Sequence, residues 1–397
     1  MQTNIHHTEV QGQDNSVKRT IAEIHGKAEG PTLIFFGGMH GNEKAGVYAL
    51  KDALKCINPK QLNGSIYAIA GNLKALERDL RYIDADLNRL WTTGNIEAIK
   101  NKAILNHEEK ELLKLLSLLE DILNKNSGPF YFFDLHTTSS KTLPFITIND
   151  ALINRKFSRL FPVPIVLGIE EYLNGPLLSY INTLGYVSLG FESGQHLDAQ
   201  SVENNIAFIN LVMHYTGAFR SNKKDKIAHY NLLEEESKSL NQFFEITHLH
   251  KINSEDSFKM KEGFDSFQKI QKGVEVALSN KASIYSNHNG LIFMPLYQKK
   301  GAEGYFIIRT IRPFYLYLSV FLRRIKIDNL LVWLPGISWQ NKEKGVLRVN
   351  LNVAKFFVKP IFHVLGYRNR QITETHYNLY NRERVAKTSV YKQQPWY

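Results

Sequence analysis

The stretch PTLIFFGGMHGNE, residues 31–43, decides the fold that this sequence predicts. Its first six residues form a short apolar run bounded by glycines, which is typical of a buried strand, and a helical pattern follows from about residue 42 to residue 54. The glycines between the two permit a tight turn and a close approach of the backbone to a bound group. We therefore expect a strand, a turn and a helix here.

His40 and Glu43 in this turn have the spacing of two ligands to one metal ion, with His40 at the strand end and Glu43 on the opening helical turn. The spacing alone is not specific, because His6 and Glu9 share it and no strand precedes them. A polar turn that caps the helix is the alternative to a metal site.

Further along the chain, short apolar runs alternate with helical patterns. Strands are predicted at residues 65–70, 130–135 and 186–191, and helices at 107–125 and 199–215. Strands that alternate with helices imply an α/β fold, with a mixed, mostly parallel sheet covered by helices on both faces. Sheets of this kind bind ligands at the carboxyl ends of their strands.

The run FYFFDLHTT, residues 130–138, supplies a third candidate ligand, His136, at the end of its strand. His136 is expected on the same edge of the sheet as His40, which is the condition for sharing an ion. Asp134 lies on the same face of the strand as His136 and is a candidate to support it. A histidine that makes ordinary loop contacts is the alternative. Two histidines and a glutamate leave one zinc position open for water, as in a catalytic site.

Glu192, in GFESG at residues 190–194, ends the strand before it and is expected on the same rim. It is our candidate for the base that takes a proton from a metal-bound water and passes it to a leaving nitrogen. A turn or helix-start carboxylate is the alternative. Arg81 and Arg89 suit an acidic substrate or a developing oxyanion, because arginine grips oxyanions through two bonds. Surface salt bridges are the alternative for both arginines.

Composition limits the class of protein. The 397 residues exceed the size of a typical single core, so two or more domains are expected. Hydrophobic residues make up 43% and charged residues 22%, as in an ordinary globular protein. A single cysteine, Cys56, excludes an intramolecular disulfide framework. The polar first residues lack the apolar core of a secretory signal, so a cytoplasmic enzyme is the simplest interpretation.

The pattern along the chain changes at RSNKKDK, residues 220–226, the best candidate for a domain boundary. We predict a catalytic α/β domain over residues 1–220, a small β domain over 221–311 that closes over the active site, and a basic, aromatic-rich extension over 312–397. Residues 309–397 hold 16 Lys and Arg against 4 Asp and Glu, a local charge of +12, so this segment accounts for the whole net charge of +11. Charged residues interrupt the longest apolar stretch there, which argues against a transmembrane helix.

Four motifs resemble the succinylglutamate desuccinylase and aspartoacylase family of the zinc carboxypeptidase clan. They are HGNE at 40–43, RYIDADLNR at 81–89, DLHTT at 134–138 and FESG at 191–194, and the resemblance covers about residues 15–310. It implies a zinc carboxypeptidase-like fold, zinc ligation by His40, Glu43 and His136, and a general acid/base role for Glu192.

The resemblance also implies how a substrate binds. Asn88 and Arg89 would bind the substrate carboxylate, and Arg81 would polarise the scissile carbonyl. The segment at residues 289–298 resembles the one that lends a tyrosine to the pocket, so Tyr297 is our candidate, with Tyr305 as the second. Aspartoacylase itself has a further substrate-binding arginine shortly before the catalytic glutamate. The stretch from residue 178 to residue 190 contains none.

Together these features predict an amidohydrolase with one Zn²⁺ per subunit that cleaves the amide bond of a small N-acyl amino acid. A zinc carboxypeptidase acting on short peptides is the nearest alternative, since its substrates also place a carboxylate beside an amide. A binding protein whose basic segment contacts nucleic acid or anionic lipid is an alternative from another class. The sequence identifies no such partner, and it leaves the acyl group and the oligomeric state open.

Overall fold

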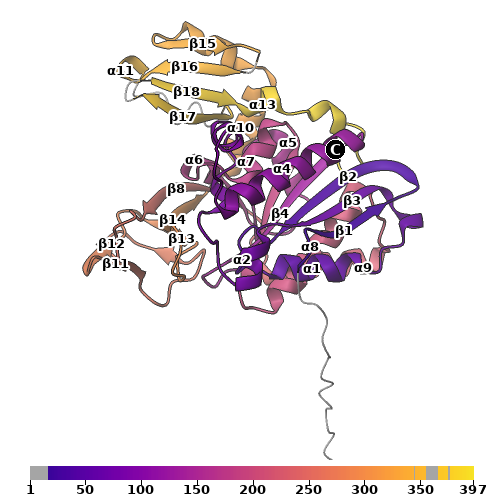
Figure 1. Ribbon diagram of the computed structural model, residues 1–397. Coiled ribbons are helices and arrows are strands. Elements are labelled where there is room, and N and C mark those ends of the chain that lie inside the picture. The colour runs from indigo at the N-terminus through magenta and orange to yellow at the C-terminus, as the bar shows by residue number, and fades with distance from the viewer. Residues whose placement is uncertain (1–16, 344, 355–364, 374–375) are drawn as a thin grey trace, which may run out of the picture.

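The computed structural model describes residues 17–343, 345–354, 365–373 and 376–397. His6 and Glu9, which share the spacing of His40 and Glu43, lie outside these ranges. Within them, one large sheet of eleven strands runs through the body of the molecule (Figure 1). In spatial order its strands are β1 (Thr20–His25), β3 (Asn63–Ala70), β2 (Ala28–Gly37), β4 (Phe130–Thr138), β7 (Val187–Gln195), β5 (Phe145–Ile148), β6 (Ile165–Leu167), β8 (Phe243–Lys251), β14 (Glu303–Thr310), β13 (Gly290–Phe293) and β10 (Lys269–Ile270).

The centre of this sheet is parallel and is buried on both faces. Strands β3, β2, β4 and β7 pair in parallel, whereas the strands at both ends pair mostly antiparallel. Because side chains alternate along a strand, Leu33 and Phe35 of β2 enter one core and Ile34 and Phe36 enter the other. The predicted mixed α/β fold with helices on both faces is confirmed.

The two cores are closed by different helices. Helices α1 (Ala45–Leu54) and α8 (Gln200–Thr216) supply the first core, and α4 (His107–Lys125) supplies the second. A capping box between Asn106 and Glu109 fixes the start of α4. The other helices in the described part of the chain are α2 (Leu73–Arg78), α3 (Thr93–Lys100), α5 (Leu152–Ser158), α6 (Ile169–Tyr172), α7 (Leu177–Thr183), α9 (Lys223–Glu236), α10 (Pro313–Arg324), α11 (Leu351–Ala354) and α13 (Arg382–Val385), with 3-10 turns at η1 (Pro59–Gln61), η2 (Leu87–Arg89), η3 (Ile327–Trp333) and η4 (Thr388–Tyr391).

The turn after β2 differs from the prediction in one respect. Helix α1 begins at Ala45, so Glu43 lies in the turn before the helix and not on its first turn. Gly38 adopts a positive φ of 72°, and a Cβ on Gly41 would come within 2.0 Å of the backbone of Ala75 in α2. These two glycines therefore let the turn pack directly against α2.

Residues beyond 220 continue the same sheet. Helix α9 packs on α8 through Leu233, and β8 pairs in parallel with β6. A second sheet of three strands follows the order β12 (Ala282–Tyr285), β11 (Glu275–Ser279) and β9 (Phe258–Met260). The division of the chain at residues 220 and 311 stays a proposal.

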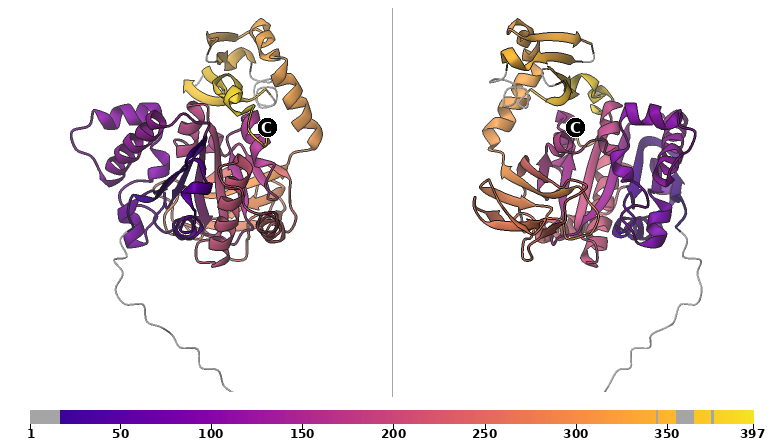
Figure 2. Two further views of the ribbon diagram at one scale, coloured as in Figure 1. Left: turned by 90° about the vertical axis from the view of Figure 1, so that its right-hand side faces the viewer. Right: turned by 60° about the vertical axis from the view of Figure 1, so that its left-hand side comes forward.

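The last part of the chain folds as a separate small sheet that Figure 2 shows at one end of the body. Its strands follow the order β15 (Ile337–Asn341), β16 (Val346–Asn350), β18 (His376–Asn381) and β17 (Tyr367–Thr373). Helix α10 runs along the outside and joins this sheet to the body (Figure 2). No helix among the described residues combines the length and the apolar content needed to cross a bilayer.

Arg323 of α10 anchors this small sheet to the body. Its side chain is fully buried, with Nη2 at 2.8 Å from Asp150 Oδ2 and Nη1 at 3.0 Å from Glu383 Oε1. Asp150 follows β5 in the body, and Glu383 follows β18 in the small sheet. A buried charge of this kind is stable only while its partners compensate it.

We expect Arg323→Ala to lower the free energy of unfolding by about 3 kcal/mol, because two carboxylates would lose their shared cation in the interior. The neighbouring Arg324→Ala removes an exposed arginine and is expected to change stability by less than about 0.5 kcal/mol. Urea unfolding of both variants measures the difference. Equal stabilities would show that Arg323 does not anchor the sheet.

Candidate active site

The candidate site is assembled where three central strands end. Strands β2, β4 and β7 are parallel neighbours, so their carboxyl ends meet at one edge of the sheet. His40 follows β2, His136 lies near the end of β4, and Glu192 lies near the end of β7. The register pairs His136 directly with Glu192. The sheet thus brings together the residues that the sequence predicted at this rim.

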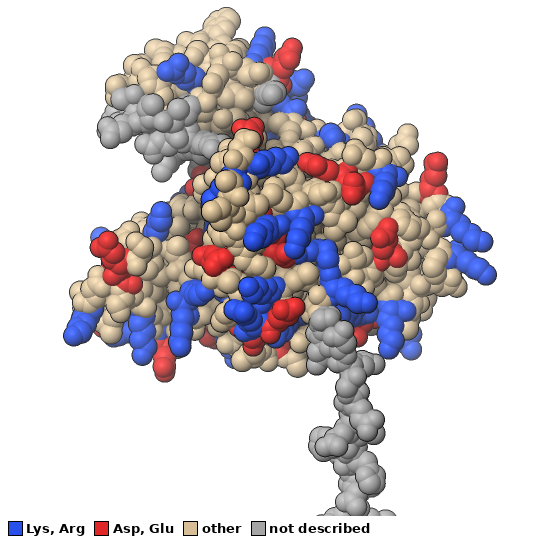
Figure 3. All heavy atoms as spheres, in the orientation of Figure 1, with Lys and Arg blue, Asp and Glu red and all other residues tan. Residues whose placement is uncertain are grey.

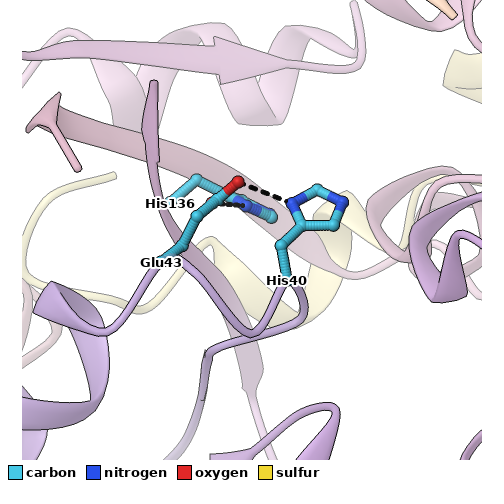
Figure 4. A group of neighbouring side chains, drawn as sticks. All are labelled: His40, Glu43 and His136. Atoms are coloured by element: carbon cyan, nitrogen blue, oxygen red, sulfur yellow. Dashed lines mark hydrogen bonds and ion pairs between the residues drawn. The ribbon is translucent and has the colours of Figure 1, made fainter. Parts of the chain in front are cut away.

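His40, Glu43 and His136 offer ligand atoms that all lie within 4.8 Å of one another, and all three residues are buried. Glu43 lies between the two rings (Figure 4), with its Oε1 at 2.7 Å from His40 Nδ1 and its Oε2 at 2.8 Å from His136 Nδ1. Two imidazole nitrogens and one carboxylate oxygen are a donor set that suits zinc and leaves a coordination position for water or substrate.

The Nε2 atom of each histidine ring, the one that does not face Glu43, lies beside a carboxylate of its own. His136 Nε2 lies 2.8 Å from Asp134 Oδ2, and His40 Nε2 lies 3.2 Å from Asp86 Oδ1. Carboxylates in this position fix the ring orientation and raise the basicity of a metal ligand. Asp134 was a sequence candidate for this place. Asp86 was not, because its position in RYIDADLNR does not reveal which residue it faces.

The charges in this cluster compensate one another. Burial alone would raise the pKa of Glu43, but His40 and His136 lower that pKa well below its ordinary value. Burial would likewise raise the pKa of Asp86, but His40 and Arg81 lower it strongly. Burial lowers the pKa of His136, and Asp134 and Glu43 overcome this and raise it well above its ordinary value. Glu43 and Asp86 are therefore ionised beside the histidine rings, which favours a bound cation.

Glu192 has a different environment from these carboxylates. It is buried, and its Oε2 has no hydrogen-bond partner among the described residues. Burial raises the pKa of Glu192 to about 8, with His136 lowering it and Glu43 raising it further. A carboxyl group with a raised pKa can accept and return a proton near neutral pH.

One buried carboxylate shapes the loop that carries the predicted arginines. Glu108 of α4 accepts hydrogen bonds from the backbone N–H groups of Ile83 (2.7 Å), Asp84 (2.9 Å) and Ala85 (3.1 Å). It also accepts one from Asn72 Nδ2 at 2.8 Å. Sequence reasoning missed Glu108, because a glutamate in the first turn of a helix is ordinary there.

Arg81 and Asn88 reach the metal-ligand cluster from this loop. Arg81 Nη2 donates to Asp86 Oδ2 at 3.1 Å, and its Nη1 lies 3.5 Å from Glu43 Oε1. Asn88 Nδ2 lies 3.4 Å from His136 Nε2, and Asn88 Oδ1 accepts a hydrogen bond from Leu177 N at 2.8 Å.

Arg89 is already paired. Its Nη2 and Nε donate to Glu303 Oε1 at 3.1 Å and 3.3 Å, and its Nη1 donates to the carbonyl oxygen of Asn88 at 2.9 Å. Glu303 opens β14, more than two hundred residues away in the chain. Sequence reasoning did not find Glu303, since only the pairing of β14 with β8 brings it to this loop.

These residues line a cavity with about 1010 Å³ of empty space, part of it open to solvent. His40, Glu43, Arg81, Asn88, Arg89, His136 and Glu192 all face it. Apolar side chains form much of the remaining wall: Ile148, Ile169, Leu173, Pro176, Leu178, Met294, Pro295, Leu296 and Phe306.

The structure does not bring Tyr297 to this cavity. Its hydroxyl donates to the carbonyl oxygen of Lys261 at 2.7 Å and accepts from Phe264 N at 3.1 Å. Tyr305 is buried and stacks on His250, away from the lining residues. The neighbouring Gln298 lines the cavity instead, and its Oε1 accepts from Asn42 Nδ2 at 2.8 Å.

Comparison with known proteins points to one family. Residues 29–209 match the model described as the succinylglutamate desuccinylase/aspartoacylase catalytic domain. A probable aspartoacylase of Acaryochloris marina is 32% identical over 127 residues, which are 31% of this chain and 40% of that protein. The aspartoacylase of Rattus norvegicus is 34% identical over 118 residues, which are 27% of this chain and 34% of that protein. The chain therefore matches well under half of the length of these relatives.

A solved structure agrees with the fold. The structure of a succinylglutamate desuccinylase/aspartoacylase from Rhodobacter sphaeroides superposes with a TM-score of 0.54 at 15% identity, over 72% of this chain and 87% of that one. At this identity the likeness establishes the fold alone.

We expect Asp134→Asn to weaken zinc binding by about 10- to 100-fold, because His136 would lose the carboxylate that orients it. Isothermal titration of the metal-stripped protein with Zn²⁺ measures the affinity. Asp198→Asn changes an exposed aspartate beyond β7 and is the control, with no expected effect. Unchanged affinity in Asp134→Asn would show that Asp134 does not support the metal ligand.

Proposed function

We propose that this chain hydrolyses the amide bond of a small N-acyl amino acid with one zinc ion per subunit. The match of residues 29–209 to the succinylglutamate desuccinylase/aspartoacylase catalytic domain supports this. The observation that carries the proposal is the convergence of His40, Glu43 and His136 beside the unpaired buried carboxyl of Glu192. His40, Glu43 and His136 would hold the ion. When bound, zinc supplies Lewis-acid chemistry, acidifying a water molecule and polarising a carbonyl.

Glu192 would carry the proton in this reaction. Burial raises the pKa of Glu192 to about 8, and a cation bound beside His136 would lower this pKa toward 7. Glu192 is then able to take a proton from the attacking water and to give one to the departing amine. The direct register between His136 and Glu192 keeps the carboxyl beside the metal ligands during both steps.

Arg81 would stabilise the negative charge that develops on the substrate carbonyl. Asp86 holds one of its terminal nitrogens, at 3.1 Å, while Glu43 lies 3.5 Å from the other. This arrangement fixes the guanidinium before the substrate arrives, so little reorganisation is needed in the transition state. Burial lowers the pKa of Arg81, and Asp86 and Glu43 outweigh this and raise it, so the group stays charged.

The cavity also suggests how the substrate carboxylate would be recognised. Asn88 and Arg89 line the cavity and are the predicted ligands of the amino acid's carboxylate. The guanidinium group of Arg89, however, already donates two hydrogen bonds to Glu303. A substrate carboxylate must therefore displace Glu303 or share Arg89 with it. The apolar wall suits a substrate with an apolar acyl group or side chain.

The cytoplasmic location stays a prediction from the sequence, and the acyl group and the oligomeric state stay open. Lys and Arg side chains lie among acidic ones over the face drawn in Figure 3.

We expect Glu192→Gln to abolish hydrolysis of N-acetyl, N-succinyl and longer N-acyl amino acids while zinc remains bound, because glutamine cannot transfer the proton. Turnover assays and a metal assay on the same preparation test this. Activity equal to that of the unaltered protein would remove Glu192 from the reaction. Short peptides assayed in parallel separate a deacylase from a carboxypeptidase, because only the latter would release C-terminal residues.

Glu303→Gln is expected to lower KM for an N-acyl amino acid by about fivefold, with kcat changed by less than about twofold, because a partly buried ion pair contributes on the order of 1 kcal/mol. The same substrate with its carboxylate converted to an amide should show no such gain. Glu245→Gln breaks an ion pair with Arg309 away from the cavity and is the matched control. A higher KM in Glu303→Gln would show that Glu303 assists binding by orienting Arg89.

A further inference from the structure

Helix α10 buries two polar side chains and exposes its four aromatic ones. Its buried residues are Leu316, Ser319 and Arg323, of which two are polar. Its outer face carries Phe314 and Tyr317, each 67% exposed, and Phe321, 59% exposed. A surface helix normally shows the reverse arrangement, with apolar residues toward the core.

The segment after α10 extends this outer face. Ile325 is 52% exposed, Leu330 57% and Trp333 83%, and α10 and η3 are in contact. We call Phe314, Tyr317, Phe321, Ile325, Leu330 and Trp333 the aromatic face. Several large apolar side chains exposed along one helix and the turn after it indicate an interaction site more than single scattered ones do.

Buried polar contacts on the opposite side of α10 prevent the helix from rotating to bury the aromatic face. Arg323 lies on the opposite side of α10 and is held between Asp150 and Glu383. Ser319 Oγ also accepts a hydrogen bond from Arg155 Nη1 at 3.3 Å. Rotation of the helix would break these buried polar contacts, which costs more than burying the aromatic rings would return. The contacts of Arg323 and Ser319 therefore fix the orientation of α10, with its aromatic rings toward solvent.

The charges around the aromatic face indicate the kind of partner. Arg312, Arg324 and Lys326 are exposed beside it, and residues 311–334 contain a single acidic residue, Asp328. A second copy of this chain would bring the same positive rim against itself, which is unfavourable. A negatively charged partner is complementary.

Among negatively charged partners, the aliphatic residues of the aromatic face favour a lipid bilayer over nucleic acid. Nucleic acid offers bases that stack on aromatic rings, but it offers nothing to Ile325 and Leu330. The interface of a bilayer accepts both kinds of side chain, with tyrosine and tryptophan at the headgroups, aliphatic groups below them, and arginine and lysine on anionic headgroups. We propose that the aromatic face docks the protein on the surface of an anionic phospholipid bilayer.

Sedimentation with vesicles tests the proposal on the full chain. The vesicles contain phosphatidylcholine alone or with about a third phosphatidylglycerol, which carries the negative charge. We expect binding to the anionic vesicles that weakens with salt, and little binding to the neutral ones. A blue shift of tryptophan emission on binding, absent from Trp333→Ser, would place Trp333 at the lipid.

The triple variant Phe314→Ser/Tyr317→Ser/Phe321→Ser is expected to reduce binding by at least about tenfold, since it removes three rings from the interface. Ile104→Ser/Leu197→Ser removes two residues that are 82% and 95% exposed elsewhere, and it should bind as the unaltered protein does. Circular dichroism confirms that both variants fold.

Three outcomes would overturn the proposal. One is the absence of binding to anionic vesicles, and another is equal binding by the triple variant. The third is a dimer in analytical ultracentrifugation that the triple variant dissociates, because a second copy would then cover the aromatic face.

Discussion

The parallel pairing of β2, β4 and β7 is the constraint on which the candidate site depends. Parallel strands all end at the same edge, so residues that follow them are brought together whatever their separation in the chain. Here the pairing places the turn after β2, the end of β4 and the end of β7 side by side. The same strands are buried on both faces by the two cores, so their ends cannot shift independently. A rigid rim of this kind suits a metal site, which tolerates little error in ligand position.

Buried charge is the second organising feature, and it is compensated locally throughout. Glu43 faces both histidines, Asp86 and Asp134 hold the outer nitrogens of the rings, and Arg81 bridges Asp86 and Glu43. Glu192 differs from Glu43 and Asp86, because burial raises its pKa while the neighbouring cations lower the pKa of the other two. The difference in environment separates residues that are suited to hold an ion from a residue that is suited to move a proton.

The basic C-terminal extension is part of the folded body and not a loose tail. The hydroxyl of Tyr391 donates to the carbonyl oxygen of Phe130 in β4 and accepts from Val187 N in β7, at 3.0 Å. Arg382 pairs with Glu170, which lines the cavity. The extension therefore contacts the two strands that carry His136 and Glu192, as well as one wall of the cavity.

The sequence by itself determined the α/β class, the strands that bear the site and its central residues. Apolar runs that end in GGMHGNE, DLHTT and FESG predict His40, Glu43, His136 and Glu192, because local pattern sets strand ends and parallel strands share an edge. Tertiary structure alone decided the contacts that depend on distant pairing. Glu303 reaches Arg89 through β14, Glu108 holds the arginine loop from α4, and Tyr297 is directed to Lys261 and Phe264 instead of the cavity. Side-chain partners that lie 25 to 214 residues apart depend on strand register and helix packing, and neither is encoded in a local motif.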